Sequence, residues 1–204
     1  MKFFSIDLET TGLDPRKHSI TEFGAVFADA EGKMPIQTFY RWIAPLDFVW
    51  SAYCLDLHKN WISTVSSRLR NNEIDGSPKI CMNFQQCISD FQKWMVEDLG
   101  LLVLKLDAPQ QRVKYTAAGK NFGSFDLQFL RAAGFPEMFR HRSLDPTILY
   151  VQPGDEFLPE LKECKTRAIR DGCKAFGSAE VAHSGVEDAL DIVHLLQFAY
   201  RGQP

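Results

Sequence analysis

The sequence predicts an α/β protein in which helices pack on a mixed β-sheet. Two observations support this fold class. The chain begins with three strand-like segments in succession, and from residue 113 onward strand-like and helix-like segments alternate. Strands joined by tight turns pair antiparallel, whereas strands separated by helices pair parallel, so we expect one sheet with both kinds of pairing.

Three strands are expected at the beginning of the chain. Residues 4–8 alternate apolar and polar side chains, which is the period of a half-buried strand. Residues 20–28 and 37–43 are rich in Phe, Thr, Val and Tyr, and the turn-like residues 29–33 separate them. The pattern predicts an antiparallel meander.

The middle of the chain is less regular. Residues 45–58 show no period and are expected to be irregular. Residues 84–95 are predicted to be helical, because apolar side chains recur there at helical spacing. These side chains are Phe84, Cys87, Ile88, Phe91, Trp94 and Met95. Residues 113–118 return to strand composition.

In the second half of the chain, predicted helices alternate with strand-like segments. Helices are predicted over 124–133, ended by Gly134, and over 158–169, with a short strand at 142–144 between them.

Two further helix starts carry capping signals. Asp145 can cap a helix that has Pro146 in its first turn. Ser184 and Glu187 form a capping box, in which the Ser hydroxyl accepts from the third helical N–H and the Glu reaches back. This predicts a long last helix that ends near Tyr200.

The composition indicates a globular chain. Its 204 residues are 45% apolar and 24% charged with a formal charge of −3, which predicts one domain over 1–204 and excludes disorder and collagen. A chain of this length buries a core without disulfides or a structural metal. The weak acidic balance argues against a dedicated duplex-DNA binder, but it leaves a nucleic-acid enzyme with a local basic groove open.

The cysteines and the N-terminus suggest a compartment. The five cysteines are scattered and none form a C-x-x-C pair, so they are expected to be thiols in a reducing environment. We find neither a signal-peptide pattern nor an uncharged apolar stretch that could span a bilayer. The expected location is the cytoplasm, or the nucleus in a eukaryote.

The first candidate site residues are two acids on the first strand. Asp7 and Glu9 lie two apart, so both side chains point to the same face, and the small residues of Thr10, Thr11 and Gly12 follow them. The ordinary alternative is a polar stripe that faces solvent.

Three more titratable residues occur later in the chain. Asp188 falls on the apolar stripe of the last helix and needs a cation nearby, unless it is simply exposed near the helix N-terminus. Asp126 lies where a strand gives way to a helix, and its alternative role is to complement the helix dipole. His183 precedes the last helix and is either a base or a structural histidine.

Together these residues indicate metal chemistry. Four carboxylates are hard oxygen ligands that suit Mg²⁺ or Mn²⁺ better than zinc. Two such ions a few ångströms apart can activate a water and stabilise the leaving oxygen of a phosphoryl displacement.

Three blocks of the sequence resemble a known family. Residues 5–12 are similar to a D-x-E-T-T-G motif, 121–126 to N-x-x-x-F-D, and 183–189 to H-x-x-x-x-D. In this order they resemble the DEDDh 3′→5′ exonucleases, the DnaQ-like branch of the RNase H-like superfamily, whose members include proofreading subunits, RNase T and oligoribonuclease.

The resemblance implies a fold and a site. The fold would be a five-stranded mixed sheet, with the first three strands antiparallel and the remaining strands parallel to the first. Asp7, Glu9 and Asp188 would hold one metal ion, and Asp7 and Asp126 would contribute to a second. His183 would accept the proton of the attacking water. Asp145 falls where the family often has an Asp, but we favour a capping role for it.

The resemblance covers residues 5 to 189, although residues 98–111 resemble an insertion. Candidate substrate contacts are Leu8, Thr10, His58, Phe122 and Phe125. The phenylalanines would stack on a base or pack in the core, and His58 would contact a terminal phosphate or be merely exposed.

A basic cluster would line the path of the substrate strand, or form a solvated helix face. Its members are Lys162, Lys165, Arg167, Arg170 and Lys174.

The predicted function is release of 5′-mononucleotides from the 3′ end of single-stranded DNA or RNA, with two Mg²⁺ or Mn²⁺ ions. The alternatives are a nucleic-acid-binding adaptor of the same fold without turnover, and a metal phosphatase that acts on small esters. The sequence does not decide between DNA and RNA as substrate. It also leaves open whether the protein forms a homodimer or works with a polymerase. Two bound divalent ions would add four charges and bring the formal charge from −3 to +1, so we expect them to stabilise the protein.

Overall fold

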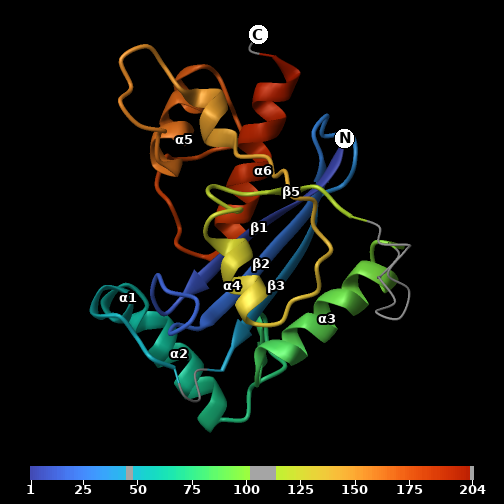
Figure 1. Ribbon diagram of the computed structural model, residues 1–204, viewed down its shortest axis with the longest axis vertical. Helices are drawn as coiled ribbons and strands as arrows, with labels where there is room; N and C mark the ends of the chain where they lie inside the picture. Colours follow the sequence, from blue (N-terminus) through green and yellow to red (C-terminus); the bar gives the residue numbers. More distant parts are fainter. Residues whose placement is uncertain (45–47, 102–113, 203–204) are drawn as a thin grey trace.

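A five-stranded mixed sheet forms the centre of the computed structural model, which describes residues 1–44, 48–101 and 114–202 (Figure 1). The strand order is β4-β3-β2-β1-β5. The strands are β1 Lys2–Thr10, β2 Ile20–Asp29, β3 Gln37–Ile43, β4 Lys79–Cys81 and β5 Ala117–Ala118.

The predicted strand directions are confirmed. β1 pairs antiparallel with β2, and β2 pairs antiparallel with β3, so β3 runs in the direction of β1. β5 is parallel to β1 and β4 is parallel to β3. Both remaining strands therefore run parallel to the first, as the resemblance implied.

The membership of the sheet differs from the prediction. The strand expected at 142–144 is only an isolated bridge between Leu144 and Ala118. The fifth strand is instead β4, whose three residues are too few to show a period of two. The strand expected at 113–118 is shortened to β5, with a bridge at Tyr115, and residue 113 lies outside the described residues.

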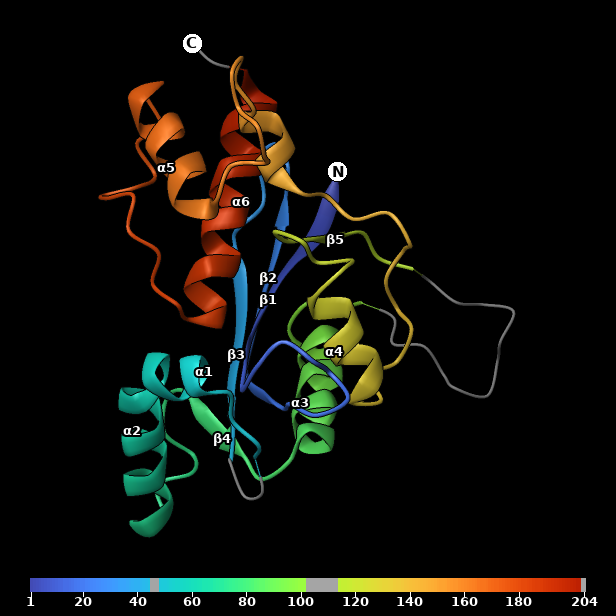
Figure 2. The same cartoon turned by 60° about the vertical axis from the view of Figure 1, so that its left-hand side comes forward.

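Both faces of β1 are covered, so the expectation of a half-buried strand is wrong. Phe4, Ile6 and Leu8 pack in one core cluster with α3 Phe84–Glu97. Phe3 on the other face packs in a second cluster with α6 Gly185–Arg201. Figure 2 shows α3 and α4 on one side of the sheet, with α5 and α6 on the other.

The remaining predicted helices form close to their expected bounds. They are α4 Asp126–Ala132, α5 Leu161–Arg170 and the 3₁₀ helix η1 Pro146–Tyr150. Asp145 caps η1 as predicted, because its carboxylate accepts from the N–H of Thr147 at 3.0 Å. Gly134 follows α4 with a φ of 78°, which suits glycine.

One helix, α1 Ala52–Leu57, contradicts the prediction that 45–58 is irregular. A second helix, α2 Lys59–Arg70, follows directly, in a range for which no element was predicted. The Ser51 hydroxyl caps α1 by accepting from the N–H of Cys54 at 3.2 Å. Six residues are too short for a helical period to stand out. Residues 45–47 of this prediction, and 102–111 of the expected insertion, lie outside the described residues.

The thiols agree with the prediction, since all five cysteines are free and buried. Within the described ranges, every helix is too short or too polar to cross a membrane.

Candidate active site

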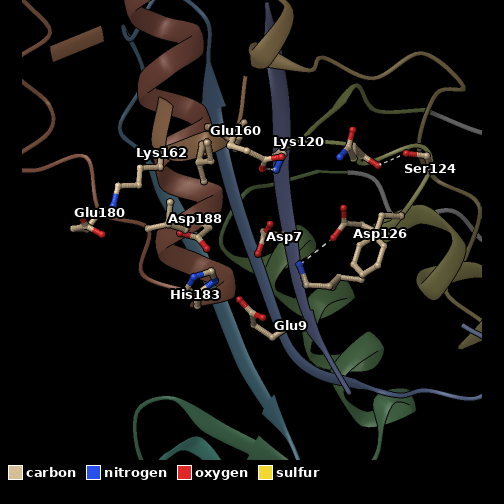
Figure 3. A pocket seen from close by; sticks show the side chains of 16 residues that line it. Asp7, Glu9, Lys120, Ser124, Asp126, Glu160, Lys162, Glu180, His183 and Asp188 are labelled. Atoms are coloured by element: carbon tan, nitrogen blue, oxygen red, sulfur yellow. Dashed lines mark hydrogen bonds and ion pairs between the residues drawn. The ribbon is translucent and has the colours of Figure 1, made fainter. Parts of the chain in front are cut away.

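All five residues predicted to be catalytic line one pocket of about 710 Å³ (Figure 3). Asp7 and Glu9 come from β1, Asp126 from the start of α4, and Asp188 from the first turn of α6. His183 lies just before α6. The pocket therefore joins parts of the chain that are far apart in sequence.

Asp7 and Glu9 point to the face of β1 that α6 covers, so the solvent-facing alternative is wrong. The approach of α6 depends on two glycines. A Cβ on Gly24, the residue opposite Asp7 on β2, would lie 2.0 Å from the backbone of Gly185. Only glycine permits this contact, which seats the N-terminus of α6 on the sheet and brings Asp188 to the pocket.

Asp126 and Asp188 are both buried, with 3% and 5% of their surfaces exposed. Asp126 accepts a hydrogen bond at 3.1 Å from the N–H of Leu8, and Asp188 accepts one at 3.3 Å from the N–H of Ala182. Asp188 is therefore not the exposed carboxylate of its alternative. Asp126 lies in the first turn of α4, where it can also complement the helix dipole, as its alternative holds.

The turn before Asp126 is held by the predicted cap residue. The Asp145 carboxylate accepts from the N–H of Asn121 at 3.0 Å, in addition to its bond with Thr147. Asn121 has a φ of 57°, a left-handed conformation that Asn tolerates better than most residues. Asp145 therefore also supports the loop that carries Asp126.

His183 is exposed at the edge of the pocket and has a φ of 52°. One ligand atom from each of Glu9, His183 and Asp188 lies within 4.8 Å of the other two. The imidazole therefore lies next to the carboxylates, where it can meet a molecule bound by them.

The electrostatics of the pocket are those of crowded acids in a desolvated place. Burial raises the pKa of Asp7 well above its usual range, and the neighbouring Asp126, Glu9 and Asp188 raise it further. Burial likewise raises the pKa of Glu9 to about 8, of Asp126 to about 7 and of Asp188 to about 6. The charged form of each carboxyl is therefore less stable in the folded protein than in water.

A divalent cation fits this donor set. The four groups present oxygen ligands at one pocket, and in the described part of the chain none of them forms an ion pair with Lys or Arg. His58 lies 3.4 Å from Glu9, but burial lowers the pKa of that imidazole. Buried carboxylates without Lys or Arg need another source of positive charge. The structure thus agrees with the expectation of a metal site.

The raised pKa values predict how stability depends on pH and metal. Carboxyls that bind protons more tightly when folded lose stability as pH rises from their ordinary pKa towards the raised one. We expect the Tm of the metal-free protein to fall by about 5–10 °C between pH 6.5 and 8.5, given about 1.4 kcal/mol per pKa unit and 2–4 °C per kcal/mol. Saturating Mg²⁺ or Mn²⁺ should raise the Tm most at the high end.

Thermal unfolding with a chelator and with each ion checks this. Burial and His183 lower the pKa of the buried His58, and a lowered histidine pKa adds no loss of stability as pH rises. The variant Glu9→Gln should flatten the metal-free profile. A Tm unmoved by saturating ion would contradict the expectation.

Glu22 was missed by the sequence analysis. It lies opposite Glu9 in the pairing of β1 and β2 and is 4% exposed. Its carboxylate accepts from the N–H of Gly185 at 3.3 Å and from the hydroxyl of Tyr40. Burial raises its pKa to about 7. The available signal was a Glu followed by the uncharged run Phe23 to Ala28 in the same strand.

The capping hydrogen bond that was predicted for Ser184 at the start of α6 does not form. The Ser184 side chain makes no capping bond and instead donates to the Tyr40 hydroxyl at 3.3 Å. Glu22, on β2, caps the helix instead, because its carboxylate accepts from the N–H of Gly185. The helix start is correct, but a residue distant in sequence satisfies it.

His58 is buried, so the alternative of an exposed side chain is wrong. Its Nε2 lies 3.4 Å from a carboxylate oxygen of Glu9, and the ring of Trp50 lies against it. The imidazole therefore supports Glu9 from behind the pocket.

Of the other predicted substrate contacts, two line the pocket and two do not. Phe122 is 1% exposed and packs edge-on against Phe139, so no base can stack on it. Leu8 and Phe125 line the pocket. Thr10 is buried and its hydroxyl donates to the carbonyl of Gly12 at 2.8 Å, which gives it a role in the turn.

The basic cluster does not form one path. Lys165 is buried and lies 2.5 Å from Asp191, while Arg167 is buried and paired with Asp155. Arg170 pairs with its neighbour Asp171. Of the five members only Lys162 lines the pocket.

Comparisons with known proteins agree with the fold. Residues 4–98 match a family model described as exonuclease. No curated protein sequence matches the chain.

Several solved structures are similar. The nuclease domain of 3′hExo, a DEDDh family member bound to rAMP, shares 18% identity with a TM-score of 0.58, over 99% of this chain and 93% of that one. Cell-death related nuclease 4 (CRN-4) shares 17% identity with a TM-score of 0.59, over 96% of this chain. Exonuclease I from Methylocaldum szegediense shares 14% identity with a TM-score of 0.58, over the whole of this chain.

The chain spans 62% of the length of CRN-4 and 41% of that exonuclease I. At these identities the likeness establishes the fold, which is the RNase H-like fold predicted from the sequence.

Proposed function

From the DEDDh exonuclease fold of this chain, we propose that it is a metal-dependent 3′→5′ exonuclease that releases 5′-mononucleotides from single-stranded DNA or RNA. The fold and the exonuclease match over residues 4–98 support a nuclease. The observation that carries the finer proposal is the convergence of Asp7, Glu9, Asp126, Asp188 and His183 on one pocket.

The carboxylates are the proposed metal ligands. Asp7, Glu9 and Asp188 would hold one Mg²⁺ or Mn²⁺ ion, and Asp7 and Asp126 would contribute to a second. Such ions make water a better nucleophile at neutral pH and neutralise charge on the phosphate and its leaving oxygen.

Protein side chains supply the proton acceptor and hold the carboxylates in position. His183 is exposed next to Glu9 and Asp188, so its imidazole can accept the proton of the attacking water. Glu9 is supported by His58 behind it, and Asp126 by the N–H of Leu8. These contacts hold the carboxylates in place before substrate arrives, which lowers the cost of ordering the site.

An oligonucleotide assay tests the proposal. A 5′-labelled single strand incubated with Mg²⁺ or Mn²⁺ should shorten stepwise from its 3′ end and release 5′-mononucleotides, and a chelator should stop the reaction. Matched DNA and RNA strands, single-stranded or with a recessed 3′ end, establish the preferred substrate.

Other outcomes would favour the alternatives. Tight binding without cleavage across several divalent ions would support an adaptor that lacks turnover. Hydrolysis of a small phosphomonoester, with oligonucleotides left intact, would support a phosphatase.

A further inference from the structure

Two ion pairs line the pocket, above His183 and Glu9 in the view of Figure 3. Lys120, in the turn after β5, contacts the carboxylate of Glu160. Lys162, in the first turn of α5, lies 2.7 Å from the carboxylate of Glu180. The pairs connect three separate segments of the chain.

Among the residues that line this pocket, Lys120 and Lys162 are the only Lys or Arg side chains in the part of the chain that the structure describes. They are the lysines of this pocket with which a phosphate of an anionic substrate can pair. In the free protein their charge is already matched by two glutamates.

The glutamates are easily displaced. The side chains of Glu160 and Glu180 are 75% and 74% exposed, so each can turn into water without losing packing. Exposed ion pairs contribute about 0–1 kcal/mol, so exchanging one partner for another costs little.

Such an exchange leaves the segment before His183 in place. The carbonyl of Glu180 accepts from Lys165 Nζ at 2.5 Å, and the same ammonium lies 2.5 Å from Asp191 of α6. The backbone at Glu180 is therefore held independently of its side chain.

Resting on the nuclease function proposed above, we propose that Lys120 and Lys162 bind phosphodiester groups of the substrate strand. Glu160 and Glu180 take the place of these phosphates in the free protein. A lysine ammonium contacts phosphate oxygens whatever the base, which suits an enzyme that removes nucleotides in succession.

The proposal predicts opposite effects for the two members of each pair. Lys120→Ala and Lys162→Ala should each weaken binding of a fluorescein-labelled oligothymidylate about threefold, with a salt dependence shallower by about 0.7 in log–log slope per contact. Glu160→Gln and Glu180→Gln should strengthen binding. In cleavage assays the same variants should change KM in these directions and leave kcat unchanged.

Fluorescence anisotropy gives the binding constants. It is measured across salt concentrations with Mg²⁺, below the unfolding temperature, and with every variant built on His183→Asn so that the labelled strand is not degraded during the measurement. A matched control is the exposed pair of Arg131 and Glu137, 3.2 Å apart and outside this pocket. Arg131→Ala and Glu137→Gln should bind like the unmodified protein. A methylphosphonate strand lacks the phosphate charge, so its affinity for the lysine variants should equal its affinity for the unmodified protein.

The results that would overturn the subsite are specific. Glutamine variants that weaken binding would mean that the pairs only stabilise the fold, and lysine variants with unchanged affinity and slope would remove phosphate binding. Absence of any oligonucleotide binding would also overturn it. Because anisotropy needs no cleavage, a failure of the exonuclease proposal with intact lysine effects is distinguishable from a failure of the subsite.

Discussion

Asp7→Ala is expected to lower oligonucleotide turnover by about 10³-fold or more. Asp7 lies at the centre of the acidic group, where it is the carboxylate assigned to both metal ions. Loss of a ligand shared by two ions removes several kcal/mol of stabilisation from the transition state, and each 1.36 kcal/mol is a factor of ten in rate. Single-turnover cleavage of a 5′-labelled strand in Mg²⁺ measures the loss.

The same substitution should stabilise the metal-free protein. The pKa of Asp7 is raised because its charge is desolvated and faces Asp126, Glu9 and Asp188. Removing this group relieves that cost at pH 8, so the metal-free Tm should rise while the increase caused by Mg²⁺ shrinks. Lost activity together with higher metal-free stability cannot come from misfolding.

A matched control for Asp7 is Asp56 on α1, whose side chain is 83% exposed. Asp56→Ala should keep both turnover and the metal response of the Tm. If Asp7→Ala retains the turnover of the unmodified protein, in a preparation free of other nucleases, the exonuclease assignment is wrong.

His183→Asn is expected to lower kcat by about 10²- to 10⁴-fold, the usual contribution of a general base. Asparagine is the best replacement, because the φ of 52° at this position is left-handed and Asn tolerates that conformation. The substitution therefore removes the proton acceptor with little change to the backbone.

The metal response separates His183 from the carboxylates. If His183 moves a proton, His183→Asn should keep the increase in Tm with Mg²⁺ or Mn²⁺ that Asp7→Ala loses. Turnover within a few-fold of the unmodified protein would exclude His183 as the base. Loss of both turnover and the metal response would make it a metal ligand instead.

The sequence by itself determined the elements whose patterns are long enough to be periodic. β1 follows from alternation, β2 and β3 from their composition and the turn between them, and α3 from helical spacing. All of these are local properties of the chain. The helix start at Gly185 was also correct. Short elements such as β4 and α1 carry no readable period, so they were missed.

The sequence also named the five residues that meet in the pocket. Asp7 and Glu9 share a face because of the period of the strand alone. Asp126, His183 and Asp188 were joined to them through motifs that resemble a family, since no local rule connects residues more than a hundred positions apart. Their assigned roles stay predictions.

Only the tertiary structure decided what surrounds each group. A local pattern shows which face a side chain takes, but it does not show what covers that face. The close approach of Gly24 and Gly185 puts α6 over Asp7, and Glu22 rather than Ser184 caps that helix. Lys165 looked like part of a substrate path, yet it is buried against Asp191. Desolvation and ion pairing depend on neighbours from distant parts of the chain, so the charge of each group was decided by the fold.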